Sequence, residues 1–309
     1  MSQALWLAAM LAGGCPQQEA VLEQMAKAIE KDYVIAQEAR QIAESVRDWS
    51  DKGRYADACG DWLSFSKRLN RDLDAYDGHF LIERVIEEKA GADDDWLMAW
   101  RAAGKPANMG VREVKVLEGN IGYLRLASFY PWDMAGPKLR NAMELLKDTQ
   151  GLVLDLRQNG GGDADTAGQL VRAFLGDEVA SVQDIQARSA RRTEPLPKRD
   201  LPEYHGGLVV LLDRRSASAS EYVAYSLQAA SRAVVIGSRS AGAANLLGDP
   251  KPLPHGFQIF IPDARPLNVR TGGNWDREGV VPDVNGGDDP LHVARRVLGG
   301  DLEVGEAIR

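Results

Sequence analysis

The sequence predicts an α/β protein in which a layer of parallel strands follows an N-terminal helical bundle. Apolar residues recur at helical spacing over residues 18–75, whereas short apolar runs alternate with helical patterns after residue 111. The 309 residues suggest roughly two domains. A hydrophobic fraction of 44% is enough for a packed core, so the chain is expected to be globular.

The first part of the chain, residues 18–75, is expected to form a small bundle of helices. The polar Asp-Lys-Gly sequence at 51–53 indicates a break between two of them. Residues 80–86 indicate a strand or short hairpin. The connection that follows is expected to be loop-like at 91–95 and at 104–108, because glycine and polar residues are frequent there.

In the second part, expected strands and helices alternate. The continuous apolar run 151–156 is typical of a buried parallel strand, and Gly119-Asn120 indicates a hairpin turn. The other expected strands are 114–117, 121–126, 208–212, 234–237 and 258–261. The expected helices are 137–147, 164–175, 219–230 and 290–298, with a hairpin arm or surface loop at 183–203.

Charge and composition exclude several classes of protein. The net charge of −8 argues against nucleic-acid binding, and no apolar run approaches the length of about 20 residues that spans a bilayer. Two cysteines are too few for a disulfide-rich scaffold or a thiolate zinc site. The four histidines lack metal-ligand spacing, so we expect no metal and no cofactor; they are His79, His205, His255 and His292.

The N-terminus has two interpretations. The apolar run Ala4–Ala12, followed by two glycines and Cys15, resembles a signal peptide that ends at a lipoprotein cysteine. The run lacks a preceding positive charge, and the alternative is a buried or frayed first helix. A lipid anchor at Cys15 would place the protein in the cell envelope or periplasm and leave Cys59 as a single free thiol; the alternative location is cytoplasmic.

These features divide the chain into four segments. The predicted limits are 1–17 for the signal or lipoprotein segment or frayed helix, 18–85 for a helical cap, 86–110 for a connecting segment, and 111–309 for a β/α core.

Two turns that follow expected strands can carry chemistry. In residues 155–162, three glycines after a buried strand let backbone N–H groups face an anion, as in an oxyanion hole. A plain strand-to-helix turn or a phosphate site would look similar. In residues 216–221, Ser218 stands before a helix and the N–H of Ala219 can face an oxyanion. Ser218 and Glu221 also fit a capping box, in which the serine only caps the helix.

Two further segments contain candidate acid and base groups. His79 follows Asp77-Gly78 at the end of the helical part, where one histidine is usually structural unless a serine nearby needs a base. Residues 273–283 combine turn residues, a tryptophan and acids. This loop is either a surface turn or the source of a carboxylate that orients the base.

Taken together, four motifs resemble the C-terminal-processing, or tail-specific, protease family: LDLRQNGGG at 154–162, SASASE at 216–221, RAVVIGSRSAG at 232–242 and GNWDREGVVPDV at 273–284. The resemblance covers about residues 70–298. It implies a ClpP/crotonase-like β/α spiral core and places the nucleophile at Ser218.

The chain departs from the tail-specific pattern at its general base. That branch uses a lysine after the next strand, where this chain has Ala243, and there is no room for the usual PDZ domain. The sequence is more similar to a PDZ-less branch that includes the tricorn protease core and the repeats of interphotoreceptor retinoid-binding protein. There a histidine before the core replaces the lysine, and His79 stands at that place. Asp276 aligns with a family carboxylate that is usually glutamate, and Gly78 replaces a serine of tricorn.

The resemblance therefore implies a serine peptidase that acts on peptides or proteins without a cofactor. Ser218 would be the nucleophile, His79 the general base, and Asp276 the supporting carboxylate. Gly160 or Gly161, together with Ala219, would form the oxyanion hole. The alternative is a weak or inactive binding module for peptides or apolar ligands on the same fold. An acyl-CoA enzyme with the crotonase-like core is a weaker third interpretation.

Overall fold

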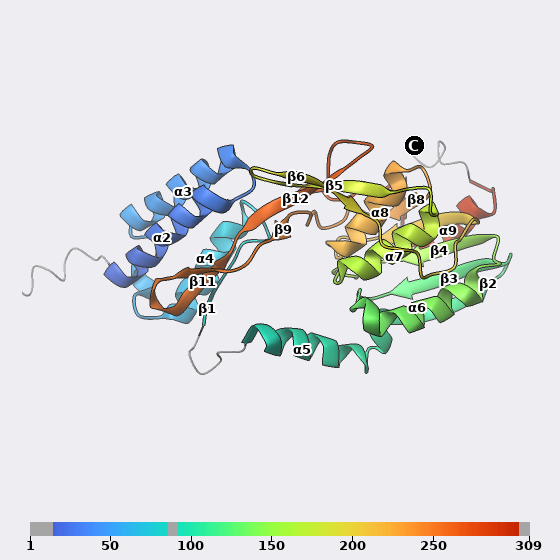
Figure 1. Ribbon diagram of the computed structural model, residues 1–309, viewed down its shortest axis with the longest axis horizontal. Coiled ribbons are helices and arrows are strands. Elements are labelled where there is room, and N and C mark those ends of the chain that lie inside the picture. The colour runs from blue at the N-terminus through green and yellow to red at the C-terminus, as the bar shows by residue number, and fades with distance from the viewer. Residues whose placement is uncertain (1–14, 86–91, 303–309) are drawn as a thin grey trace, which may run out of the picture. The chain divides into compact units, whose positions relative to one another are not determined.

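The computed structural model describes residues 15–85 and 92–302, and the chain forms two compact units (Figure 1). The helical unit comprises Met1–Ala92, Gln186–Arg191 and Asn245–Arg265. The sheet unit comprises Asp93–Ile185, Arg192–Ala244 and Pro266–Arg309. The predicted domain limits are continuous in sequence, whereas each unit combines three separate segments. The predicted signal segment lies, up to residue 14, outside the described residues.

The helical unit confirms the expected helical bundle. Its helices are α2 (Pro16–Asp32), α3 (Ala36–Asp51) and α4 (Trp62–Asp74), with a short 3₁₀ helix η1 (Ala56–Ala58) before α4. The helices α2 and α3 pack side by side (Figure 1). A three-stranded antiparallel sheet completes the core of the unit, in the order β1 (Leu81–Arg84), β11 (Phe257–Phe260), β10 (Lys251–Leu253). Two of these strands come from the later segment 245–265, so the helical unit needs that segment for its core.

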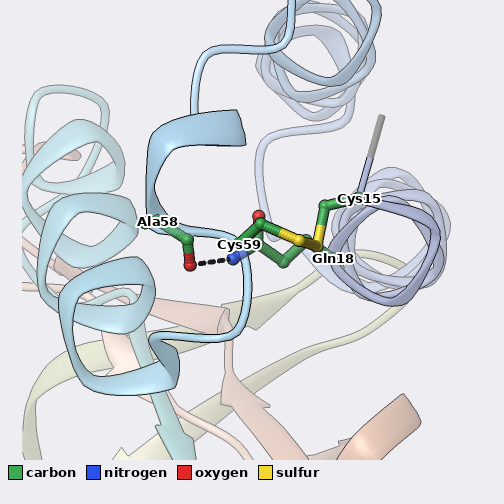
Figure 2. Close-up of a disulfide and its surroundings, with 4 residues drawn as sticks. All are labelled: Cys15, Gln18, Ala58 and Cys59. Atoms are coloured by element: carbon green, nitrogen blue, oxygen red, sulfur yellow. Dashed lines mark hydrogen bonds between the residues drawn. A yellow bond between two sulfur atoms is a disulfide. The ribbon is translucent and has the colours of Figure 1, made fainter. Parts of the chain in front are cut away.

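A disulfide joins the start of α2 to the residue that follows η1. Cys15 and Cys59 are bonded with their Cα atoms 5.7 Å apart, a usual separation for a disulfide. Beside it, the buried Gln18 donates from Nε2 to the carbonyl of Ala58 at 2.7 Å (Figure 2). Cys59 is therefore not the free thiol that the lipid-anchor interpretation requires. One sulfur cannot carry both a disulfide and a lipid thioether, so this structure and a lipid anchor at Cys15 exclude each other.

The sheet unit is built on six strands in the order β13-β8-β7-β4-β3-β2. β2 and β3 form an antiparallel hairpin through the predicted Gly119-Asn120 turn, and the other neighbours are parallel. The strands are β2 (Val111–Leu117), β3 (Ile121–Leu126), β4 (Gly151–Asp155), β7 (Gly207–Leu212), β8 (Val234–Gly237) and β13 (Val284–Asn285).

Helices cover both faces of this sheet. Leu152 and Leu154 of β4 face a core that includes α6 (Trp132–Leu146), α7 (Ala164–Leu175) and α8 (Ala219–Ala229). Val153, between them, faces α9 (Pro290–Leu298) on the opposite side. Because β4 is buried on both faces, its sequence is a continuous apolar run, as predicted. The predicted α/β fold with an N-terminal helical bundle is confirmed.

Several expected elements differ from those observed. Helix α5 (Ala92–Gly104) occupies residues 92–95, where a loop was expected. Helix α6 begins at Trp132, five residues before Pro137, because one proline inside a helix removes only one hydrogen bond and this helix is packed along one side. The stretch 183–203 contains the hairpin β5 (Ser181–Ala187) and β6 (Arg191–Pro195).

Four short or proline-containing strands were not predicted: β9 (Leu246–Leu247), β10, β12 (Pro262–Asn268) and β13. Proline is disfavoured within strands, and β12 contains two. Among the helices that the structure describes, none is both long and apolar enough to cross a membrane.

Candidate functional site

Three loops meet at one edge of the sheet unit. β4, β7 and β8 are parallel neighbours, with Asp155 opposite Leu211 and Leu212 opposite Gly237. Their carboxyl ends therefore lie at the same edge, which is where ligands bind in open α/β sheets. The loop after β4 holds the three glycines, the loop after β7 holds the SASASE sequence, and the loop after β8 runs through Ala243.

The three serines of the SASASE turn are not equivalent. Ser216 and Ser220 are fully buried. Each donates its hydroxyl to a backbone carbonyl at 2.8 Å, Ser216 to Leu156 and Ser220 to Asn159. Ser218 is exposed. The outer serines therefore fasten the turn to the preceding strand and the glycine loop. The middle serine is exposed and forms, with Glu221, the capping box that the sequence indicated at the start of α8.

The backbone of Ser218 is held in an uncommon conformation. Its φ of 54° and ψ of −116° are adopted immediately before helix α8. A non-glycine residue in such a conformation is strained, and strain of this kind concentrates at functional sites. Gly161 allows the arrangement, because a Cβ atom there would lie 2.8 Å from both the Ser218 Cβ and the Ala217 carbonyl oxygen. The glycine loop and the serine turn are thus in direct contact.

The candidate oxyanion donors are arranged around this contact. A Cβ on Gly161 would also approach the backbone nitrogen of Ala219 to 3.0 Å, so the two candidates lie next to each other. The N–H of Gly161 donates to Oδ1 of Asn159 at 2.9 Å. The neighbouring Gly160 is exposed. The structure thus brings Gly161 and Ala219 together beside Ser218, and Gly160 directly precedes Gly161 in the chain.

The side chain of Glu221 holds the backbone of the serine turn in place. Its side chain is fully buried, and it accepts the N–H of Ser218 at 2.8 Å and that of Ala243 at 2.9 Å on one oxygen. The other oxygen accepts from the Ser240 hydroxyl at 2.5 Å and the Gly242 N–H at 2.7 Å. Burial raises the pKa of Glu221, although these four donors oppose the shift. Because Ser218 and Ala243 share one acceptor oxygen, position 243 lies beside the nucleophile candidate.

The loop that contains Asp276 is hydrogen-bonded to the loop that follows β8. The buried Trp275 donates from its indole to the Ala243 carbonyl at 2.9 Å. Asp276 accepts a long hydrogen bond of 3.4 Å from the N–H of Ala244, and its own N–H donates to Asn274. Asp276 therefore stands next to the loop that follows β8. We call the glycine loop, the SASASE turn and this 240–244 loop the serine half-site.

His79 lies in the helical unit, shortly after α4, and its partner there is Asp77. The Asp77 Oδ1 atom lies 2.8 Å from Nδ1 of His79 and also accepts the backbone N–H of His79 at 2.9 Å. The side chain of His79 is 17% exposed, and Asp77 is 1% exposed. A carboxylate that accepts from Nδ1 orients the ring and leaves the proton-accepting lone pair of neutral histidine on Nε2.

Two other residues bind the second oxygen of Asp77. The Tyr33 hydroxyl donates to Oδ2 at 3.1 Å, and Nδ2 of Asn245 donates at 2.8 Å. Burial acts to raise the pKa of Asp77, but the hydrogen bonds from His79 and Asn245 outweigh it and the pKa is lowered. We call Tyr33, Asp77, His79 and Asn245 the histidine half-site.

His79 was predicted from the sequence, but its carboxylate partner was not. The only local signal is the spacing of two residues in Asp77-Gly78-His79, which lets one carboxylate bind both the backbone and the ring of the histidine. Tyr33 and Asn245 gave no signal, because they are distant in sequence and belong to no motif.

The two half-sites are linked by continuous chain. Ala243 donates to Glu221 in the sheet unit, and Asn245, two residues later, donates to Asp77 in the helical unit. The segment that follows β8 therefore contributes a hydrogen bond to each half-site.

Comparison with known proteins shows the family. Residues 120–285 match Peptidase family S41, a stretch of more than half of the chain. A carboxy-terminal-processing protease of Bartonella bacilliformis is 36% identical over 143 residues, covering 43% of this chain and 31% of that protein. A tail-specific protease of Haemophilus influenzae is 30% identical over 182 residues, covering 55% of this chain and 25% of that protein. The chain thus spans less than a third of the length of these two relatives.

A solved structure extends the likeness over nearly the whole chain. A lipoprotein from Streptococcus agalactiae has a TM-score of 0.64 and 17% identity, covering 93% of this chain and 98% of that one. At this identity the likeness shows a shared fold alone. The sequence match covers the glycine loop, the SASASE turn and the Asp276 loop. On that basis the chain belongs to Peptidase family S41, as the motifs predicted.

Proposed function

We propose that the protein is a serine peptidase that hydrolyses peptide bonds with Ser218 as nucleophile and His79 as general base. The observation that carries the proposal is the contrast within the SASASE turn. Ser216 and Ser220 are buried and fasten the turn, whereas Ser218 is exposed, has a positive φ and lies against Gly161. This is the arrangement that a nucleophilic serine requires.

The proposed reaction has two steps. Nε2 of His79 takes the proton of the Ser218 hydroxyl while Oγ attacks the peptide carbonyl, and the carbonyl oxygen becomes an oxyanion. The N–H groups of Ala219 and of Gly160 or Gly161 hold that oxyanion; since Gly161 donates to Asn159, Gly160 is the donor with the more accessible position. His79 then protonates the leaving amine. In the second step His79 takes a proton from water, the water attacks the acyl-enzyme, and the proton returns to the Ser218 oxygen as the product acid leaves.

The carboxylates have different parts in this proposal. Asp77 binds Nδ1 of His79 and stabilises the imidazolium that forms when the ring takes the proton. Asp276, which the family resemblance indicated, is assigned an electrostatic role near the loop that follows β8. The reaction requires His79 to reach Ser218 in the active enzyme.

We also propose an extracytoplasmic location, in the cell envelope. The Cys15–Cys59 disulfide supports it, because such bonds persist in oxidising compartments. A lipid anchor at Cys15 would need the same sulfur, so mass spectrometry of the peptide that contains Cys15 distinguishes the two modifications. A disulfide-linked pair of peptides fits the structure, and a lipidated peptide requires a reduced Cys59.

Labelling with a fluorophosphonate probe tests the proposed nucleophile and base. We expect labelling of the wild type and none of Ser218→Ala. Ser231→Ala is a matched control, because Ser231 is also exposed and also has a φ of 54°. Labelling of Ser218→Ala at the wild-type level would overturn the nucleophile assignment. Wild-type labelling of His79→Ala would overturn the base assignment, and an unlabelled wild type would favour the binding-module alternative.

A further inference from the structure

The carboxylate of Asp77 divides its two oxygens between different partners. Oδ1 accepts from His79, through the backbone N–H and the ring. Oδ2 accepts from Tyr33 and Asn245, which reach it from the end of α2 and from the segment 245–265. All of these donors lie in the helical unit, so the arrangement is internal to it.

The division of partners between the two Asp77 oxygens affects how the carboxylate is held against the His79 imidazole. A buried carboxylate with one oxygen unsupported could turn about its Cβ–Cγ bond and move its plane out of line with the ring. Two donors on Oδ2 oppose that partial rotation, because it would break both hydrogen bonds at a residue that is 1% exposed, whereas a half turn only exchanges two equivalent oxygens. Oδ1 is thereby kept against Nδ1 of His79.

We propose that Tyr33 and Asn245 are positioning residues for His79. By holding Oδ2 of Asp77 they fix Oδ1, and Oδ1 in turn fixes the tautomer of His79 that carries its proton on Nδ1. The tautomer claim depends only on hydrogen bonds within the helical unit. Its consequence for catalysis rests on the proposed function, in which Nε2 takes the proton of Ser218.

Both positioning residues are themselves fixed. Tyr33 is fully buried, its N–H donates to Ile29, and its ring centroid lies 5.1 Å from that of Phe80. Asn245 is 4% exposed. Because both side chains are buried, close packing limits how far they can follow Asp77 if the carboxylate turns.

Nitrogen-15 NMR of the histidine rings tests the tautomer directly. The chain has four histidines, so the spectrum is simple and His79→Ala assigns the signal. We expect the wild-type signal of neutral His79 to show the Nδ1–H form. Tyr33→Phe and Asn245→Leu should each move it toward a mixture of both tautomers. They should also slow fluorophosphonate labelling of Ser218 by about 10- to 100-fold, the usual effect of losing a hydrogen bond to a charged group.

Tyr55→Phe is the matched control, because Tyr55 is also buried in the helical unit and donates to an aspartate, Asp72, at 2.8 Å. It should leave both the His79 signal and the labelling rate unchanged. If Tyr33→Phe fails to fold, the proposal is tested by Asn245→Leu, which alters a different segment. An unchanged His79 tautomer in a folded variant would overturn the positioning proposal. A changed tautomer with an unchanged labelling rate would uphold it and overturn the role of His79 as the base.

Discussion

The serine and histidine half-sites are stabilised in opposite ways. In the serine half-site, one buried carboxylate, Glu221, accepts mainly backbone N–H groups from two neighbouring loops, and glycine permits their close approach. In the histidine half-site, one buried carboxylate, Asp77, accepts from side chains supplied by segments that are far apart in sequence.

This contrast predicts which substitutions each half-site tolerates. Backbone donors are present whatever the side chain, so the serine half-site depends on Glu221 and on glycine at positions such as 161. The donors to Asp77 are mostly side chains, so single substitutions can remove them one at a time. We therefore expect the serine half-site to respond chiefly in stability and the histidine half-site chiefly in reactivity.

The largest expected effect is on the histidine half-site. Asp77→Asn can present its amide to Nδ1 of His79 and so favour the tautomer with the proton on Nε2. In a serine protease of another fold the same change lowers turnover about 10⁴-fold, and we expect a comparable loss in the rate of fluorophosphonate labelling. Asp72→Asn is the control, since Asp72 binds Tyr55 and Arg54 away from His79. A loss of less than tenfold would mean that Asp77 does not set the tautomer.

The second effect concerns the serine half-site. Glu221→Ala leaves buried donors of Ser218, Ser240 and the 242–243 backbone without an acceptor, and should lower the free energy of unfolding by about 3–5 kcal/mol. Glu221→Gln keeps one carbonyl oxygen and should cost less. Urea denaturation measures both variants. Equal stabilities of the two variants would show that accepting these donors is not the main role of Glu221.

The third effect should be confined to the helical unit. Removing the disulfide in Cys15→Ser/Cys59→Ser should lower the stability of the helical unit by about 2–4 kcal/mol, because the bond closes a long loop in the unfolded chain. Hydrogen exchange should increase in α2 and η1 while β4 and β7 keep their protection. Faster exchange throughout the sheet unit would mean that the two units unfold as one.

The smallest effect is a dependence on acid. The pKa of Asp77 is lower in the folded protein than its ordinary value of 3.8. Its ionised form therefore stabilises the folded state above about pH 4, and this contribution is lost as the pH falls below 3.8 toward the lowered pKa. We expect the stability difference between wild type and Asp77→Asn to shrink between pH 5 and about pH 2. A difference that grows on acidification would contradict the lowered pKa.

Much of the fold and half of the site were predictable from sequence. The buried parallel strand β4, the helices α7 and α9 and the SASASE turn are local patterns, in which neighbouring residues carry the whole signal. Strand β12, with its two prolines, was missed because tertiary packing decides it rather than local preference. Helix α5 was missed although alanine, leucine, methionine and arginine in its sequence favour a helix.

The histidine half-site was harder to predict for a physical reason. Asp77, Tyr33 and Asn245 meet only after three separate segments have folded together, and no periodicity connects positions 33, 77 and 245. His79 was identified through a family resemblance. Its hydrogen-bond partners required the structure.

The discontinuous helical unit also sets an order of assembly during synthesis. Cys15, Cys59, Tyr33 and His79 all come before residue 80, yet Asn245 and the strands β10 and β11 are made much later. The hydrogen bonds around Asp77 therefore stay incomplete until residue 245 has been translated. A chain that stops before Asn245 would lack a finished histidine half-site, and the proposed peptidase activity would be absent from it.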